Sequence, residues 1–170
     1  IIGNIQANYK FNDELNVMVR TGIDLSYDKR TQQRPFDTYK YAYGYYKEQG
    51  INAQETNADF LITYNNNRHQ DIKFGVNVGG SMMNNKYSRE DASTNKLSYP
   101  NVYSFANSAT TVVYKPLREE YAVHSLYGLA NFSYKETFFI DGTLRVDWSS
   151  TLASPLKNEV SPFFYPSVNG

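Results

Sequence analysis

Residues 15–28 of the chain read LNVMVRTGIDLSYD, and this stretch decides the fold class. Apolar side chains occupy alternate positions from Leu15 to Tyr27, interrupted in their own series only by Thr21. A period of two places successive side chains on opposite faces of a strand, whereas an α-helix would repeat its apolar positions every 3–4 residues. The stretch therefore predicts one long β-strand with an apolar face and a more polar face.

The same alternation occurs on both sides of this strand. Residues 4–11 alternate in the same way, and the turn-forming sequence Asn12-Asp13-Glu14 joins them to it as a hairpin. Two further hairpins are predicted, with strands at 58–64 and 72–78 around a turn at 65–70, and at 128–134 and 138–148 around a turn at 135–137. The sequence thus predicts an all-β, antiparallel, up-and-down sheet of three hairpins with about six to seven strands.

The connections between these hairpins are long, whereas the hairpin turns are short. They cover residues 29–56, 83–119 and 149–162. Compact soluble domains rarely contain unstructured loops beyond about 12–15 residues, but outer-membrane barrels have short periplasmic turns and long extracellular loops. We therefore expect a segment of a transmembrane β-barrel in the outer membrane of a Gram-negative cell. Aromatic residues near the short turns fit an interfacial girdle: Tyr9, Phe11, Tyr64, Phe74, Phe132, Tyr134 and Phe138.

The composition excludes several classes of protein. Seventeen Lys and Arg residues balance 17 Asp and Glu, and there is no basic stripe, so we expect no nucleic-acid partner. The absence of cysteine excludes disulfides, thiol catalysis and Cys-ligated zinc. No apolar run approaches the roughly 18 residues of a transmembrane helix. The mean hydropathy of −0.60 is compatible with a barrel, because half of each strand would face a wet lumen.

No residue pattern indicates an enzyme. His69 and His124 are far apart and lack a metal-ligand pattern, so we interpret them as surface or lumen residues. Asp24 and Asp28, on one predicted strand, would lie about 13 Å apart, beyond the roughly 5–9.5 Å between paired glycosidase carboxylates. There is no nucleophile elbow, phosphate-binding glycine loop or zinc-binding helix. We expect no catalytic residue, no metal site and no cofactor.

The last third of the chain carries three short motifs in a recognisable order. Residues 130–134 read ANFSY, residues 145–150 read RVDWSS and residues 165–168 read YPSV. This text resembles the barrel of the SusC/RagA family, the TonB-linked outer-membrane transporters of Bacteroidetes, in which ANYxY, RxDGSS and FPSV recur in that order. Trp148 stands at the usual glycine position, and Tyr165 replaces the phenylalanine before Pro-Ser. The first two thirds of the chain match the family in architecture only.

This resemblance implies a function. Residues 1–170 would form a central part of one barrel domain of about 22 strands, without the signal peptide, TonB box and plug of family members. The whole protein would import oligosaccharides or peptides, driven by TonB through the plug, in contact with outer-membrane lipid and a SusD-like surface lipoprotein. The alternatives are a soluble secreted all-β glycan-binding module and a passive porin-like barrel. An open six-stranded sheet would leave two unpaired edges, so we do not expect this segment to be stable alone.

Candidate site residues fall into two groups. The first is predicted to face the lumen or the plug: Arg20, Asp24, Asp141, Arg145 and Asp147. Arg145 and Asp147 would form an ion pair in the lumen, contact the plug or line the transport path. The second group lies in the long connections and comprises Tyr39, Tyr41, Tyr43, Tyr45, Tyr46, Tyr99 and Tyr103. Tyrosine rings suit sugars and peptide side chains alike, but these residues could instead extend the hairpin above the membrane, pack against neighbouring loops or contact the lipoprotein.

Overall fold

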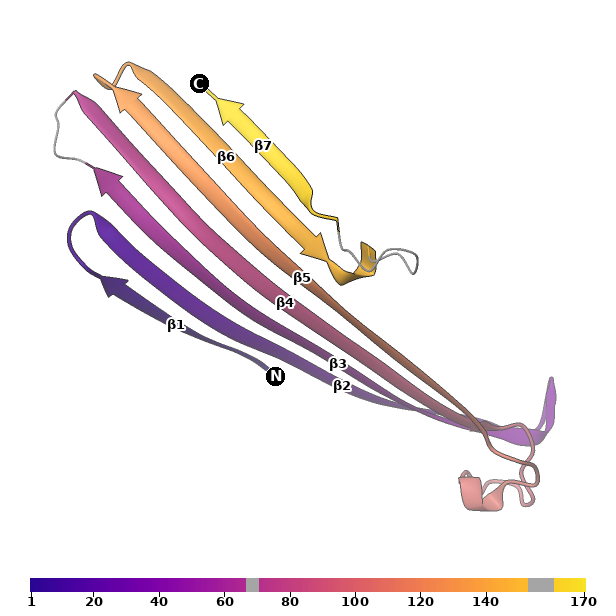
Figure 1. Ribbon diagram of the computed structural model, residues 1–170. Coiled ribbons are helices and arrows are strands. Elements are labelled where there is room, and N and C mark those ends of the chain that lie inside the picture. The colour runs from indigo at the N-terminus through magenta and orange to yellow at the C-terminus, as the bar shows by residue number, and fades with distance from the viewer. Residues whose placement is uncertain (67–70, 153–160) are drawn as a thin grey trace. The chain divides into compact units, whose positions relative to one another are not determined.

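The computed structural model describes residues 1–66, 71–152 and 161–170, so His69 lies outside the described residues. Seven strands form one antiparallel sheet in chain order (Figure 1). They are β1 (Ile2–Lys10), β2 (Leu15–Thr38), β3 (Tyr41–Asn66), β4 (Ile72–Thr94), β5 (Val113–Tyr134), β6 (Phe138–Ser149) and β7 (Phe163–Asn169). The predicted all-β, up-and-down architecture is confirmed. The sheet is open, and β1 and β7 are its edge strands.

Helical structure is limited to two short 3₁₀ turns in the part of the chain that the structure describes. These are η1 (Phe105–Asn107) and η2 (Ser150–Leu152). No helix there is both long enough and apolar enough to cross a membrane.

The inner strands are longer than the sequence predicted, and the predicted connection at 29–56 is wrong. Only Tyr39 and Lys40 separate β2 from β3. The connection predicted at 83–119 shrinks to residues 95–112, because β4 and β5 extend into it. Much of the added strand sequence, such as residues 29–34 (KRTQQR), carries polar residues on successive positions and lacks the hydrophobic alternation that reveals a half-buried strand. Residues 41–45, in which tyrosines alternate with Ala42 and Gly44, are an exception. Residues 153–160 of the third connection lie outside the described residues.

The chain comprises two compact units. The first contains Ile1–Asp24, Glu55–Asn85 and Tyr121–Gly170, and the second contains Leu25–Gln54 and Lys86–Glu120. Strands β2 to β5 each contribute residues to both units.

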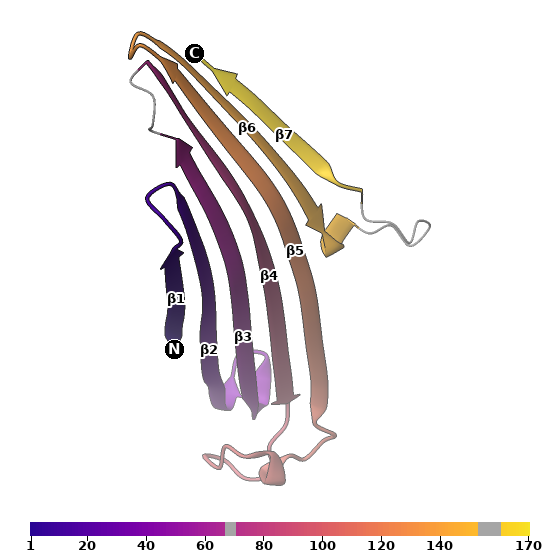
Figure 2. The same ribbon diagram turned by 60° about the vertical axis from the view of Figure 1, so that its left-hand side comes forward.

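In the first unit, the turns at residues 11–14 and 135–137 lie at the same end of the sheet (Figures 1 and 2). Between β5 and β6, Lys135 and Glu136 adopt φ angles of 51° and 53°. Two successive residues with positive φ are what a tight hairpin turn requires, because this geometry matches the twist of the flanking strands. The N–H of Thr137 donates to the carbonyl of Tyr134 at 3.1 Å and closes this turn.

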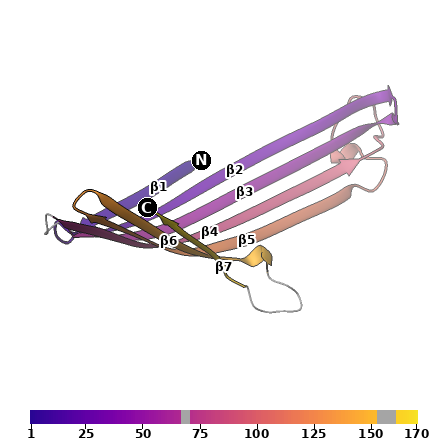
Figure 3. The same cartoon turned by 90° about the horizontal axis from the view of Figure 1, so that it is seen from above.

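In the second unit, residues 95–112 fold beside the tip of the β2–β3 hairpin (Figure 3). The N–H of Leu97 donates to the carbonyl of Tyr43 at 2.8 Å, and Leu97 forms a bridge with Ser108. The Asn107 side chain ties the loop together, since its amide donates to the carbonyls of Tyr99 and Val102 and its oxygen accepts from the Tyr99 N–H. The predicted loop is therefore an ordered element packed on its own strands.

Candidate functional site

The sheet of the first unit has one polar and one apolar face. Residues that oppose each other on neighbouring antiparallel strands point to the same face. Arg20 pairs with Gln6, and Asp24 pairs with Ile2, across β1 and β2. Across β5 and β6, the pairs on the polar face are Ser125 with Asp147, Tyr127 with Arg145 and Asn131 with Asp141. The five charged residues predicted from the sequence therefore all lie on the polar face.

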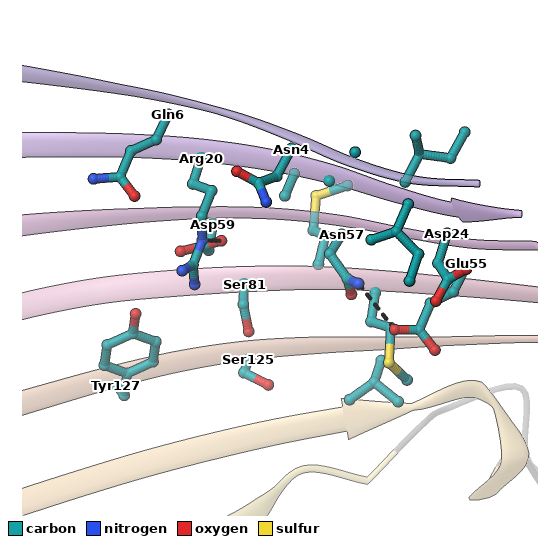
Figure 4. A pocket seen from close by; sticks show the side chains of 18 of the residues that line it. Asn4, Gln6, Arg20, Asp24, Glu55, Asn57, Asp59, Ser81, Ser125 and Tyr127 are labelled. Atoms are coloured by element: carbon teal, nitrogen blue, oxygen red, sulfur yellow. Dashed lines mark hydrogen bonds and ion pairs between the residues drawn. The ribbon is translucent and has the colours of Figure 1, made fainter.

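A hollow of about 770 Å³ opens on this polar face (Figure 4). Arg20 and Asp24 line it together with Arg145. Arg20 Nε donates to Asp59 Oδ1 on β3 at 2.9 Å, and only 13% of the Asp59 side chain is exposed. About half of the Arg20 side chain is exposed, so Arg20 is anchored by its bond to Asp59 while it remains accessible from the hollow.

Arg145 is held in a similar way on β6. Its Nε donates to Asp147 Oδ1 at 2.8 Å, and its Nη2 donates to the hydroxyl of Ser125 at 3.1 Å. The ion pair that the sequence suggested for Arg145 and Asp147 is thus present. Beside it, the ring of Tyr127 crosses Gly79, where a Cβ atom would lie 2.5 Å from the ring carbons. Any other residue at Gly79 would displace the ring.

Asp141 lies away from this hollow. It lines a separate recess of about 330 Å³ on the polar face, with its cross-strand partner Asn131 and with Asn65 and Lys73. The amide oxygens of Asn65 and Asn131 converge over Gly75, where a Cβ atom would lie less than 3 Å from both. The predicted set of charged residues therefore divides between two places on one face.

The opposite face of the first unit is apolar and exposed. In β4, the apolar residues Phe74, Val76 and Val78 are exposed, whereas Lys73 and Asn77 on the other face are half-buried. A soluble sheet shows the reverse pattern, with apolar residues inside and polar residues outside. No hydrophobic side chain of this unit is buried among the residues that the structure describes. The described residues of this unit therefore leave the apolar face uncovered.

The height of this apolar face is defined by aromatic residues. Phe138 opposes Tyr134 at the turn end, and Trp148 opposes His124 ten positions further along β6. Ten residues extend roughly 33 Å along a strand at about 3.3 Å each. With the usual strand tilt of about 40°, this length corresponds to an apolar band about 25 Å tall, as in outer-membrane barrels. The predicted aromatic residues at the turn end contact one another in two pairs, Tyr9 with Phe11 and Tyr64 with Phe74.

The structure separates the predicted tyrosines of the second unit. The rings of Tyr41 and Tyr45 contact each other with centroids 4.7 Å apart. Tyr43 packs edge-on against Phe36, and Lys96 Nζ lies 4.4 Å from the centre of its ring.

Tyr46 is buried and packs against Phe105 of the ordered loop. Its hydroxyl donates to the carboxylate of Glu48, and this hydrogen bond, with burial and the charge of Glu48, raises the pKa of Tyr46 to about 12.

Three of the remaining tyrosine positions differ in exposure. Tyr39 and Tyr99 are the most accessible, with exposed fractions of 87% and 71%. Tyr103 is half-buried in the loop. Accessible ligand-contact candidates are therefore concentrated at the hairpin tip and the start of the loop.

Sequence reasoning missed several polar residues that line the hollow of about 770 Å³, and three of them bear most on its charge and shape. Asp59 and Glu55 lie on β3, and Tyr127 lies on β5. Asp59 lies between the apolar residues Ala58 and Phe60, so the alternating pattern could have placed its side chain on the polar face. In the described part of the chain, no group of three His, Asp or Glu side chains is placed to hold a metal ion.

Comparison with known proteins places this geometry among solved structures. No protein-family model matches the chain, and neither does any curated protein. The RagAB peptide transporter matches 98% of this chain with a TM-score of 0.86 and 14% sequence identity. In fold, this chain is similar to a part of RagAB. The RagAB peptide importer in its 'closed-closed' state also matches 98% of the chain, with a TM-score of 0.83 and 16% identity.

The chain spans 19% of the length of each matching RagAB chain. At identities this low, the similarity concerns the fold. It confirms, at that level, the resemblance to the SusC/RagA barrel that the C-terminal motifs suggested. Arg145 and Tyr165 of those motifs lie side by side, because Arg145 on β6 pairs with Tyr165 on β7, and on its other side Arg145 pairs with Tyr127 on β5.

Proposed function

We propose that residues 1–170 form part of the barrel domain of a TonB-dependent transporter in the outer membrane of a Gram-negative cell. The observation that carries this proposal is the distribution of side chains on the sheet of the first unit, which is the reverse of that in a soluble protein. Its exposed face is apolar over about 25 Å, its other face is polar, and its fold is similar to part of RagAB. A soluble glycan-binding module would have to leave this apolar face in water, at a large cost in free energy.

We propose peptides or oligosaccharides as the imported substrates, with a SusD-like surface lipoprotein as partner. Similarity to a peptide transporter favours peptides as the first class to test. The exposed rings of Tyr39 and Tyr99 are the proposed contacts for substrate or lipoprotein, since tyrosine combines a flat apolar surface with a hydroxyl. We assign Tyr46, which is buried, to packing of the ordered loop.

The polar face would line the barrel interior. Arg20 and Arg145 each keep about half of the side chain exposed while an aspartate fixes the guanidinium group. Such anchored cations suit contacts with acidic groups of a plug domain or of a passing substrate, because the donors are already oriented. Asp24 and Asp141 would supply acceptors on the same face. We assign no catalytic role to these residues.

The test compares uptake in cells that produce the protein carrying this chain, with and without functional TonB. Labelled peptides and labelled oligosaccharides are supplied separately. We expect accumulation of one class only when both the protein and TonB are present. Accumulation that is unchanged without TonB would indicate a passive porin-like barrel. Recovery of the protein in the soluble secreted fraction would overturn the proposal in favour of a binding module.

A further inference from the structure

A groove of about 410 Å³ lies on the apolar face of the first unit, at the end that carries Trp148. Its walls are mainly apolar and include Val19, Phe60, Gly80, Met82, Leu126 and Trp148. Its apolar side chains lie on the opposite face of the sheet from Arg20 and Arg145, while Ala58, Ser81 and Met82 also border the hollow of the polar face.

Gly80 is required for the shape of this groove. A Cβ atom on Gly80 would lie 2.8 Å from Phe60 Cε1 and 3.0 Å from Leu126 Cδ2. Side chains from the strands on both sides thus lie over the backbone of β4 at this point. Any larger residue would push these two side chains apart and change the groove.

A smaller hollow of about 180 Å³, lined by both polar and apolar side chains, adjoins the groove. The two share Ala58, Met82 and His124. The hollow adds Thr21 and Thr56, whose hydroxyls donate to backbone carbonyls. Among the described residues that line it, none is lysine or arginine. The apolar groove and the hydrogen-bonding groups of the hollow therefore meet at His124.

We propose that this groove and hollow bind one acyl chain of a membrane lipid, with an ester of that lipid accepting from His124 and a lipid hydroxyl donating to the oxygens of the two threonines. The proposal rests on the proposed function, because it requires the apolar face to lie in a bilayer. Uncharged donors and acceptors match ester and hydroxyl groups, whereas a phosphate site would be expected to contain Lys or Arg. Trp148 lines the same groove and indicates that this groove lies at the depth of the lipid ester groups, since tryptophan favours the membrane–water interface.

The depth of the site is tested with the fluorescence of Trp148, the one tryptophan in this chain. The intact protein and its Trp148→Phe variant are placed in phosphatidylcholine vesicles whose acyl chains are brominated near the carbonyl end or near the methyl end. The difference between the two proteins isolates Trp148. We expect stronger quenching by bromine near the carbonyl end.

Occupancy is tested by Ala58→Leu, which places a larger side chain where the groove and the hollow meet. Ala58 is exposed on the apolar face, so the change does not disturb a buried contact. Ala130→Leu is the matched control, because Ala130 is exposed on the same face and does not line the groove. Lipid retained after detergent washing is counted by native mass spectrometry. We expect Ala58→Leu to weaken retention about tenfold, which corresponds to the loss of about two buried methylenes.

Two results would overturn the lipid site. Equal retention by the Ala58→Leu and Ala130→Leu proteins would exclude the groove as the binding site. Stronger quenching near the methyl end would place Trp148 too deep for the ester region. Failure of the proposed function has a different signature, since Trp148 in a protein outside the bilayer would not be quenched by either brominated lipid.

Discussion

The two units of this chain differ in where their hydrophobic side chains lie. In the first unit, no described hydrophobic side chain is buried, and large apolar residues such as Ile5 and Ile140 are exposed. In the second unit, Tyr46 and Leu97 are buried together with the polar residues Thr94 and Asn107. One unit leaves its apolar surface uncovered, while the other encloses a small core.

We propose that this difference reflects a different solvent for each unit, lipid for the first and water for the second. Burial of apolar surface is the main favourable contribution to folding in water, and the first unit achieves little of it internally. Its sheet instead satisfies backbone hydrogen bonds between strands, which is what a lipid environment demands. The second unit has a small core and a loop held together by the hydrogen bonds of the Asn107 side chain, as expected of a segment in water. Substitutions in each unit can test this difference.

The largest effect is expected from a charge on the apolar face. Leu144→Arg places a guanidinium near the middle of the apolar band, between Phe138 and Trp148. At the bilayer midplane this substitution should destabilise the inserted barrel by about 2–4 kcal/mol. The measurement is the free energy of folding of the intact protein into lipid vesicles, from denaturant titration.

Thr143→Arg is the matched control for Leu144→Arg. Thr143 is the preceding residue of β6 and is exposed on the polar face, paired with Leu129. The same charge there should change the folding free energy by less than about 1 kcal/mol, because the lumen side is wet. Equal effects at the two positions would show that the apolar face does not meet lipid.

The same contrast explains what the sequence could predict. In the first unit, one face of every strand is apolar. The alternation of residues 15–24 therefore predicts both the strand and the face on which each side chain lies. The faces of Arg20, Asp24, Asp141, Arg145 and Asp147 followed directly from this period. The partner of Arg20 did not, because Asp59 lies 39 positions away and their meeting depends on the pairing of β2 with β3.

In the second unit, the sequence signal fails for a physical reason. Residues 29–34 read KRTQQR, and a strand with polar side chains on both faces has no hydrophobic period to detect. The sequence did not predict the order of this loop, since its core depends on distant contacts, those of Leu97 with Tyr43 and of Phe105 with Tyr46. Leu97 in the polar sequence NKLSYP was one sign that this loop packs against something.

The second unit is tested by removing its core leucine. Leu97 is 2% exposed and contacts the hairpin through the carbonyl of Tyr43. Leu97→Ala should reduce the free energy of local opening by about 2–3 kcal/mol, since it leaves a cavity in a small core. Hydrogen exchange of amides in residues 41–46 and 95–108 measures this opening.

Val102→Ala provides the comparison within the same loop. Val102 is about half exposed, so its truncation should change protection by less than about 0.5 kcal/mol. Amides in residues 17–23 of the first unit should exchange at unchanged rates in both variants. Faster exchange there after Leu97→Ala would contradict a separate core in the second unit.

The smallest effect is expected from pH, through Asp91 of the second unit. Gln49 donates to Asp91 Oδ1 at 2.6 Å, and Lys47 donates to Oδ2 at 3.3 Å. Burial opposes ionisation of Asp91, but these hydrogen bonds and the charges of Lys47 and Arg89 outweigh it and lower its pKa. The folded-state pKa is thus below the unfolded value of about 3.9. The stabilisation is present above that value and is lost as the pH falls through the folded pKa.

Asp91→Asn should therefore reduce the local stability of the second unit at neutral pH by about 1 kcal/mol or less. The difference from the parent protein should shrink as the pH is lowered past the folded pKa, because Asp91 then becomes neutral as well. Hydrogen exchange of the β3 and β4 amides, measured from neutral pH down past the folded pKa of Asp91, reports both the loss of local stability and its decrease at low pH. Glu119→Gln, at an exposed carboxylate of the same unit, serves as the control. A deficit in Asp91→Asn that stays constant down to low pH would assign the effect to side-chain packing, because a charge effect must disappear when the carboxylate is protonated.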